Sequence, residues 1–307
     1  MKKLLLCLAV GVAFVSHAQQ FEVVELQQVK TGAKTAYHPR FMPDGKTLLV
    51  SSENFTGLGL VDMDRGVYTN LTDMPGAGHH PAISEDGKTI ITRSMNPHDF
   101  TQNIYKLDVA TKALTVVAEN IEHTNQVSLV NGTATVAISG KAVNTKVTDV
   151  ITPVRKMNNY LLTTEDLKIV LYKNGVRTVL DPLAGQFGDW EPQYAWVSLS
   201  PDKTKILFYC YNHTYTCNLD GSDVQQVGKF QAPQWYGNTH VVGMNDEHEG
   251  YYNTKSDIVI SRVDGTELQQ LTPSSNEIKM FPAVSADGRI AFHTEDGKIY
   301  VMTIKEK

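Results

Sequence analysis

The stretch HPAISEDGKTIIT, His80 to Thr92, is repeated in altered form at HPRFMPDGKTLLV, His38 to Val50, and at FPAVSADGRIAFH, Phe281 to His293. Each copy is an apolar run, an Asp-Gly turn and a second apolar run. Asp-Gly tolerates the positive φ angles of a tight hairpin loop, and the flanking β-branched and aromatic residues suit a pleated sheet. Each copy therefore predicts a β-hairpin, and a recurring hairpin predicts an array of similar units.

Weaker copies of the same pattern lie between the clear ones, at Asn125 to Ala137, Trp196 to Phe208 and Ala232 to Met244. The turn positions of the six copies are Asp44, Asp86, Asn131, Asp202, Asn238 and Asp287. All but one of the intervals lie near the roughly 40 to 50 residues of a propeller blade. The repeat predicts an all-β fold, a six-bladed β-propeller of four-stranded blades.

The two ends of the chain supply complementary parts of one blade. Phe21 to Val29 reads as a single strand with no hairpin partner nearby. After the last hairpin only one more strand follows, GKIYVMTIKE, Gly297 to Glu306, whereas other units have two. The N-terminal strand is therefore predicted to complete the last blade and to close the ring, which removes an exposed sheet edge.

The first eighteen residues have the features of a secretory signal peptide: Lys2-Lys3, an apolar run and small residues before a cut after Ala18. The apolar run is too short to span a membrane, and no lipid-attachment motif surrounds Cys7. We expect residues 19–307 to form one domain, free of transmembrane segments, in the periplasm or outside the cell. The net charge of −5 argues against a nucleic-acid partner.

The longest interval separates Asn131 from Asp202. We assign its excess to an insert at residues 140–166 in blade 3, with a short helix capped by Thr152 and begun by Pro153. A second long connection runs from Asp181 to Ala195. Propeller topology places both segments on the face where strand A of each blade starts.

The signature Pro81 to Lys88, in a chain with a signal peptide and with strands that end in Leu71-Thr72 and Leu271-Thr272, resembles the WD-like repeat of the TolB-type six-bladed propellers. Unlike TolB, whose propeller follows an α/β domain, this chain is expected to consist of the propeller without that domain. The resemblance covers essentially the whole of residues 19–307. Related propellers serve as protein-binding platforms, as gates on peptidases and, in oligogalacturonate lyases, as enzymes, so the resemblance implies a fold rather than one function.

Polar and aromatic side chains collect on the predicted loop face. The candidate binding residues are His38, His79, His80, His98, His123, Trp190, Trp196, His248, Tyr251 and Tyr252. His38, His80 and His123 precede strand A in their blades and would converge on the mouth of the central channel. They are candidate ligands of a divalent metal; the alternative is a polar channel mouth without one. Trp196 occupies the position of His38 and His80.

The segment Asn245 to Asp257 combines several acids with His248, Tyr251 and Tyr252. It could form a calcium loop or a sugar-binding lip, but its acids lack the alternating spacing of a calcium loop, so a solvated acidic loop is the other interpretation. Cys210 and Cys217 flank a predicted hairpin. Their spacing predicts that they lie opposite each other across two antiparallel strands, so that an exported chain would link them in a disulfide; two buried free thiols are the alternative.

Two functions follow from these patterns. The leading hypothesis is an exported, non-catalytic and monomeric propeller without a cofactor, whose loop face binds a protein or glycan partner of the cell envelope. The alternative is a metal-dependent lyase that resembles the oligogalacturonate lyases, with His38, His80 and His123 as ligands and His79 or Glu122 as the base. No nucleophile or phosphate-binding motif is present.

Overall fold

The computed structural model describes residues 20–32, 34–99, 101–121, 124–130, 133–138, 141–146, 160–174, 176–250, 252–273 and 275–307, with backbone alone between 124 and 146. Several predictions lie outside these residues. They concern the signal peptide, the Asn131-Gly132 turn, the helix begun by Pro153, and the side chains of Glu122, His123 and Tyr251. No helix among the described residues is long and apolar enough to cross a membrane.

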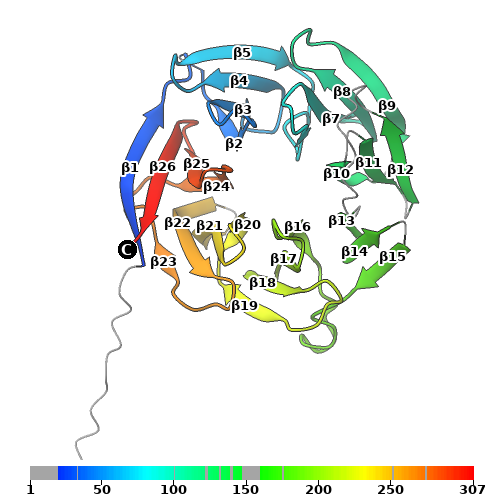
Figure 1. The fold of residues 1–307 in the computed structure, drawn as a ribbon, viewed down its shortest axis with the longest axis vertical. Helices are drawn as coiled ribbons and strands as arrows, with labels where there is room; N and C mark the ends of the chain where they lie inside the picture. The colour runs from blue at the N-terminus through cyan, green and yellow to red at the C-terminus, as the bar shows by residue number, and fades with distance from the viewer. Residues whose placement is uncertain are drawn as a thin grey trace, which may run out of the picture.

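The strands are arranged as a ring of radiating sheets around a central opening (Figure 1). The first sheet contains β2 (Tyr37–Phe41), β3 (Thr47–Ser51), β4 (Leu58–Asp62) and β5 (Val67–Thr72). The second contains β6 (Ala82–Ile83), β7 (Thr89–Met95), β8 (Gln102–Asp108) and β9 (Leu114–Ile121). Two three-stranded sheets follow: β10 (Thr124–Val130), β11 (Thr133–Ile138) and β12 (Lys141–Lys146), then β13 (Tyr160–Glu165), β14 (Lys168–Lys173) and β15 (Val176–Leu180).

Three four-stranded sheets complete the ring. The fifth contains β16 (Ala195–Leu199), β17 (Lys205–Cys210), β18 (His213–Asn218) and β19 (Gln225–Gly228). The sixth contains β20 (Gln231–Tyr236), β21 (His240–Glu249), β22 (Tyr252–Arg262) and β23 (Gln269–Gln270). The last contains β24 (Lys279–Val284), β25 (Arg289–Thr294), β26 (Ile299–Glu306) and β1 (Phe21–Val29).

The all-β propeller and its closure by the N-terminal strand are confirmed. β1 pairs with β26 in antiparallel register from Phe21 opposite Glu306 to Val29 opposite Ile299. The described strands nevertheless form seven sheets, five of four strands and two of three, where the sequence predicted six units. The difference comes entirely from the long interval before Asp202.

The segment 140–166 is not an insert within one blade. It supplies β12 to one sheet and β13 to the next, because β11 pairs with β12 and β14 pairs with β13. The turn between β13 and β14 is Asp166-Leu167, with φ angles of 48° and 63°. Two central residues with positive φ make the same tight hairpin turn that Asp-Gly favours. This turn contains no glycine, so the Asp-Gly and Asn-Gly pairs that mark other hairpins do not indicate it in the sequence.

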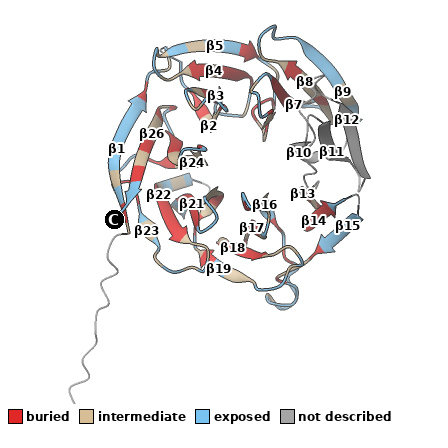
Figure 2. Ribbon diagram, in the orientation of Figure 1, coloured by how far each residue is buried: buried red, intermediate tan, exposed pale blue. Residues whose placement is uncertain are grey.

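The middle strands of the sheets are more buried than the outer ones (Figure 2). In β3 four of five residues are buried, and in β25 five of six are. Outer strands such as β1 and β15 are largely exposed. The core therefore consists of apolar layers between adjacent sheets, one of which packs Val242 and Ile260 against Ile290 and Phe292.

The predicted disulfide is wrong, and both cysteines are free and buried. The β17–β18 turn is Tyr211-Asn212, so Cys210 lies opposite His213 and Cys217 lies opposite Ile206. The two cysteines are therefore separated by four positions along the hairpin, about 13 Å at the rise of a β-strand. That separation is beyond the reach of a disulfide.

Candidate functional site at the mouth of the central channel

A strained backbone position recurs at the inner edge of five sheets. The residues concerned have positive φ angles of 52°, 50°, 48°, 46° and 50° and are His38, His80, Trp196, Ala232 and Phe281. All but Trp196 precede a proline. The strand register shifts at the same place in four of the sheets. A residue in this left-handed conformation costs about 1–2 kcal/mol, and such a bulge re-aims the side chain.

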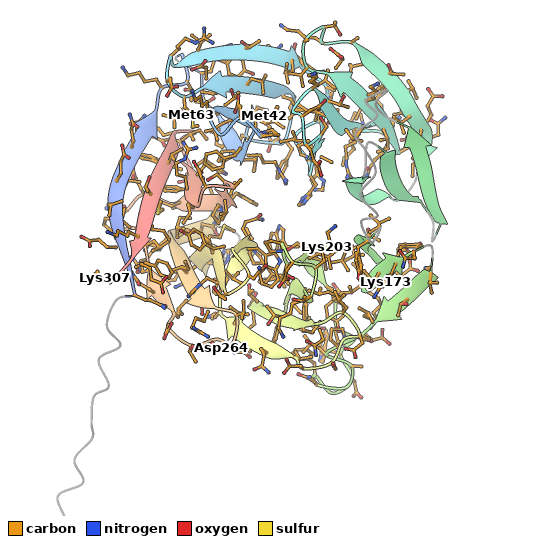
Figure 3. The ribbon with its side chains drawn as sticks, in the orientation of Figure 1. Met42, Met63, Lys173, Lys203, Asp264 and Lys307 are labelled. Atoms are coloured by element: carbon orange, nitrogen blue, oxygen red, sulfur yellow. The ribbon has the colours of Figure 1, made fainter. Side chains whose placement is uncertain are left out.

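These residues surround a cavity of about 610 Å³, and side chains from several inner strands extend toward the central opening (Figure 3). The residues that line it include His38, Arg40, Phe55, His79, His80, Thr164, Tyr194, Trp196, Ser198, Ala232, Gln234 and Phe281. They come from five inner strands and the loops beside them. Sheets that lie far apart in the sequence therefore contribute residues to one site.

His38 is held by rings on several sides. Its imidazole stacks on Phe55, with centroids 3.8 Å apart and planes 21° apart. Its Nδ1 lies 2.9 Å from Ser51 Oγ. Phe281 and His293 pack against it edge to face, with centroid distances of 4.9 and 5.0 Å. Burial, then the neighbouring His293 and Arg40, lower the pKa of His38 to about 3, so the ring is neutral at neutral pH.

Arg40 carries the positive charge of the cavity wall. Its Nη2 lies 3.5 Å from His80 Nδ1, and a guanidinium can only donate, so this nitrogen of His80 accepts. Burial and then Arg40 lower the pKa of His80 well below its ordinary value. Burial, then Arg93 and Arg40, lower the pKa of His79 to about 4. The two histidines are therefore neutral beside a permanent cation.

Arg40 is the site residue that sequence reasoning missed. Two residues beyond each left-handed position, the inner strands present Arg40, Ala82, Ser198, Gln234 and Ala283. Only one of these five is charged, which was a signal available from the repeat alignment. Arg93, on β7, was also missed: it is 2% exposed, its Nη1 donates to Gln102 Oε1 at 3.0 Å, and burial lowers its pKa to about 10.

The structure brings together four of the predicted binding residues: His38, His79, His80 and Trp196 line the cavity. Four others do not line it: His98, Trp190, His248 and Tyr252 are exposed elsewhere. Trp190 and Tyr252 are 74% and 79% exposed, which excludes a core role for Trp190. His293, the last residue of the third repeat copy, is buried against His38 and Phe281.

The acidic segment predicted as a loop extends the hairpin of β21 and β22. Asp246 contacts Nε2 of His248 and accepts a hydrogen bond from Gln231 Nε2 at 2.9 Å. Glu247 lies 3.6 Å from Lys255 Nζ across the hairpin. These carboxylates are paired with side chains of their own sheet, which does not fit a calcium loop.

The residues present do not fit the divalent metal expected at His38, His80 and His123. Nδ1 of His80 faces a guanidinium, whose positive charge repels a second cation. No Asp or Glu is among the described residues that line the cavity, and no group of three or more His, Cys, Asp or Glu in the described part of the chain could hold a metal ion. His123 lies outside that part.

No family model matches the chain, and no curated protein matches it in sequence. Solved structures do. A streptogramin B lyase matches with a TM-score of 0.61 and 13% identity over 94% of this chain and 100% of that one. The Cps50 (Swd1) propeller domain of Myceliophteria thermophila matches with a TM-score of 0.55 and 12% identity over 93% and 100%.

TolB from Acinetobacter baumannii matches with a TM-score of 0.52 and 17% identity. The match covers 81% of this chain and 56% of TolB, so the chain spans little more than half of that protein. The expected likeness to the propeller of TolB is confirmed. At these identities the three likenesses show the fold alone, and function has to be argued from the cavity.

Proposed function

We propose that this protein is a non-catalytic binding propeller that receives a partner molecule at the mouth of its central channel. The observation that carries the proposal is the composition of the cavity, in which aromatic and imidazole rings surround one guanidinium. Aromatic rings and arginine are the side chains that contribute most to recognition surfaces. Four of the rings, those of His38, His80, Trp196 and Phe281, are held at strained backbone positions, and such strain is concentrated at functional sites.

The same composition argues against acid–base catalysis. The cavity histidines have strongly lowered pKa values, whereas a general base works best with a pKa near the operating pH. The described lining residues include no carboxylate that could pair with a histidine. The site is therefore suited to holding a ligand rather than to moving a proton.

A capture experiment with matched tryptophan variants tests this proposal. The protein is immobilised and exposed to an envelope extract of its source organism, and retained partners are identified by mass spectrometry. We expect Trp196→Ala to lose partners that the parent retains, because Trp196 lines the cavity. Trp190→Ala removes an equally large side chain outside it and should retain them.

The variants must keep their thermal unfolding midpoints within a few degrees of the parent for the comparison to count. If Trp196→Ala retains the partners and Trp190→Ala loses them, binding takes place on the outer connection Asp181 to Ala195 and the channel-mouth assignment is wrong. A deletion of residues 141–165 would be unsuitable as a test, because it removes β12 and β13 from two sheets.

A further inference from the structure

We propose that Arg40 forms a carboxylate-binding site in the channel wall, and that the ligand is a peptide segment bearing this carboxylate next to an apolar side chain. The inference rests on the proposed binding function of the same cavity and specifies what that cavity recognises. Three observations support it: the hydrogen-bonding state of Arg40, the charges around it and the apolar character of the remaining wall.

Arg40 differs from the surface arginines of this protein. Four of them pair with a carboxylate: Arg65 with Asp62, Arg177 with Glu165, Arg262 with Asp264 and Arg289 with Asp287. Among the described residues, Arg40 has no such partner, and its side chain makes one long hydrogen bond, to His80. A guanidinium has five N–H donors in a planar fork. Most of the donors of Arg40 are therefore available to a ligand.

The charges around Arg40 favour an anion. Its guanidinium stays protonated at neutral pH, although burial lowers its pKa. The neighbouring histidines are neutral, and no carboxylate occurs among the described residues that line the cavity. His79 adds a buried Nδ1 without a hydrogen-bond partner among the described residues. A carboxylate binds an arginine fork through two parallel hydrogen bonds, and such bonds are stronger between charged groups.

The rest of the wall favours an apolar neighbour for that carboxylate. Most of the other lining residues are apolar: Pro39, Pro233, Pro282, Ala195, Ala232, Ala283, Val197, Phe55, Trp196 and Phe281. The polar residues among them are Thr164, Tyr194, Ser198 and Gln234. A sugar acid would bury several hydroxyl groups against these surfaces, and a hydroxyl that loses water without gaining a hydrogen bond costs roughly 1–3 kcal/mol. A carboxylate attached to an aromatic or aliphatic group avoids this cost.

Isothermal titration with three small probes tests the inference. The probes are 3-phenylpropionate, which joins a carboxylate to a ring, its neutral amide 3-phenylpropionamide, and glucuronate. We expect 3-phenylpropionate to bind at least tenfold more tightly than its amide, and more tightly than glucuronate. In Arg40→Gln the difference between acid and amide should disappear. In Arg65→Gln, which removes an exposed arginine of the first sheet, it should persist.

Several results would overturn the inference. They are equal binding of acid and amide by the parent, the absence of binding by all three probes, or an unchanged preference in a folded Arg40→Gln variant. Glucuronate binding more tightly than 3-phenylpropionate would make the ligand a sugar acid and refute the peptide. If none of the probes binds while Trp196→Ala still loses the captured partner, the carboxylate site is refuted and the proposed binding function is retained.

Discussion

Phe281 and His293 lie parallel to each other beneath the channel mouth, with ring centroids 5.5 Å apart and planes 10° apart. His293 is 2% exposed, its Nδ1 lies 3.1 Å from the carbonyl oxygen of Thr294, and its Nε2 has no partner among the described residues. Burial lowers the pKa of His293 to about 4. A protonated ring here would be a buried cation with no described carboxylate to pair with it, so folding favours the neutral form.

This arrangement predicts that acidification destabilises the protein. The unfolded chain binds a proton at each of these histidines near pH 6.5, whereas the folded chain binds it only near pH 4 at His293 and His79 and near pH 3 at His38. The stability that these histidines contribute is therefore fully present above pH 6.5 and is lost as the pH falls below that value. At pH 5 one histidine whose pKa falls from 6.5 in the unfolded chain to about 4 in the folded chain lowers the free energy of unfolding by about 2 kcal/mol.

Urea unfolding of the parent and of His293→Phe at pH 7.5 and pH 5 measures this effect. We expect the parent to lose more unfolding free energy between the two pH values than the variant, by about 2 kcal/mol. Phe281 can stack on the phenyl ring in place of the imidazole. Equal losses in the two proteins would show that His293 titrates normally in the folded state.

The left-handed backbone at Ala232 predicts intolerance of a β-branched residue. Ala232 has a φ of 46°, where a β-branched side chain is strongly disfavoured. Ala232→Val should lower the unfolding free energy by about 2 kcal/mol more than Ala291→Val, which adds the same methyl groups at a buried position of β25 outside the left-handed region. Denaturant titration of the two variants provides the comparison. Equal destabilisation by the two variants would mean that the added methyl groups act only through steric crowding and that the backbone conformation at Ala232 adds no cost.

Ring closure predicts that the N-terminal strand is needed for solubility. Removal of residues 20–29 would expose the edge of β26 along its whole length, and an unpaired edge strand promotes aggregation. We expect the shortened chain to unfold at lower temperature and to sediment as oligomers. A synthetic peptide of residues 20–31 should restore the sedimentation behaviour of the parent. A shortened chain that unfolds at the same temperature as the parent and sediments like it would contradict the pairing of β1 with β26.

The register of β17 and β18 predicts two protected thiols. Burial raises the pKa of both, that of Cys217 to about 12, so neither should react with iodoacetamide in the folded protein. After unfolding without reductant, both should be alkylated in the chain that begins at residue 20. Recovery of a peptide linked through Cys210 and Cys217 would refute the register.

The sequence by itself determined the propeller, because its evidence is local. An Asp-Gly pair between two apolar runs specifies a hairpin wherever it occurs, and recurrence of the hairpin specifies an array. The closure of the ring could also be counted from the sequence, since one strand was missing at the C-terminal end and one was spare at Phe21 to Val29. The same local reasoning failed at Asp166-Leu167, where two non-glycine residues form the turn.

Only the tertiary structure decided the site. The register of one hairpin, fixed by the Tyr211-Asn212 turn, separated the two cysteines that the spacing had paired. The convergence of Arg40, His80, Trp196 and Phe281 on one cavity depends on how separate sheets are placed around the ring. Charge and burial at that cavity are properties of all these neighbours together. For this reason a histidine pattern that suggested a metal in the sequence lies, in the folded protein, beside the guanidinium of Arg40.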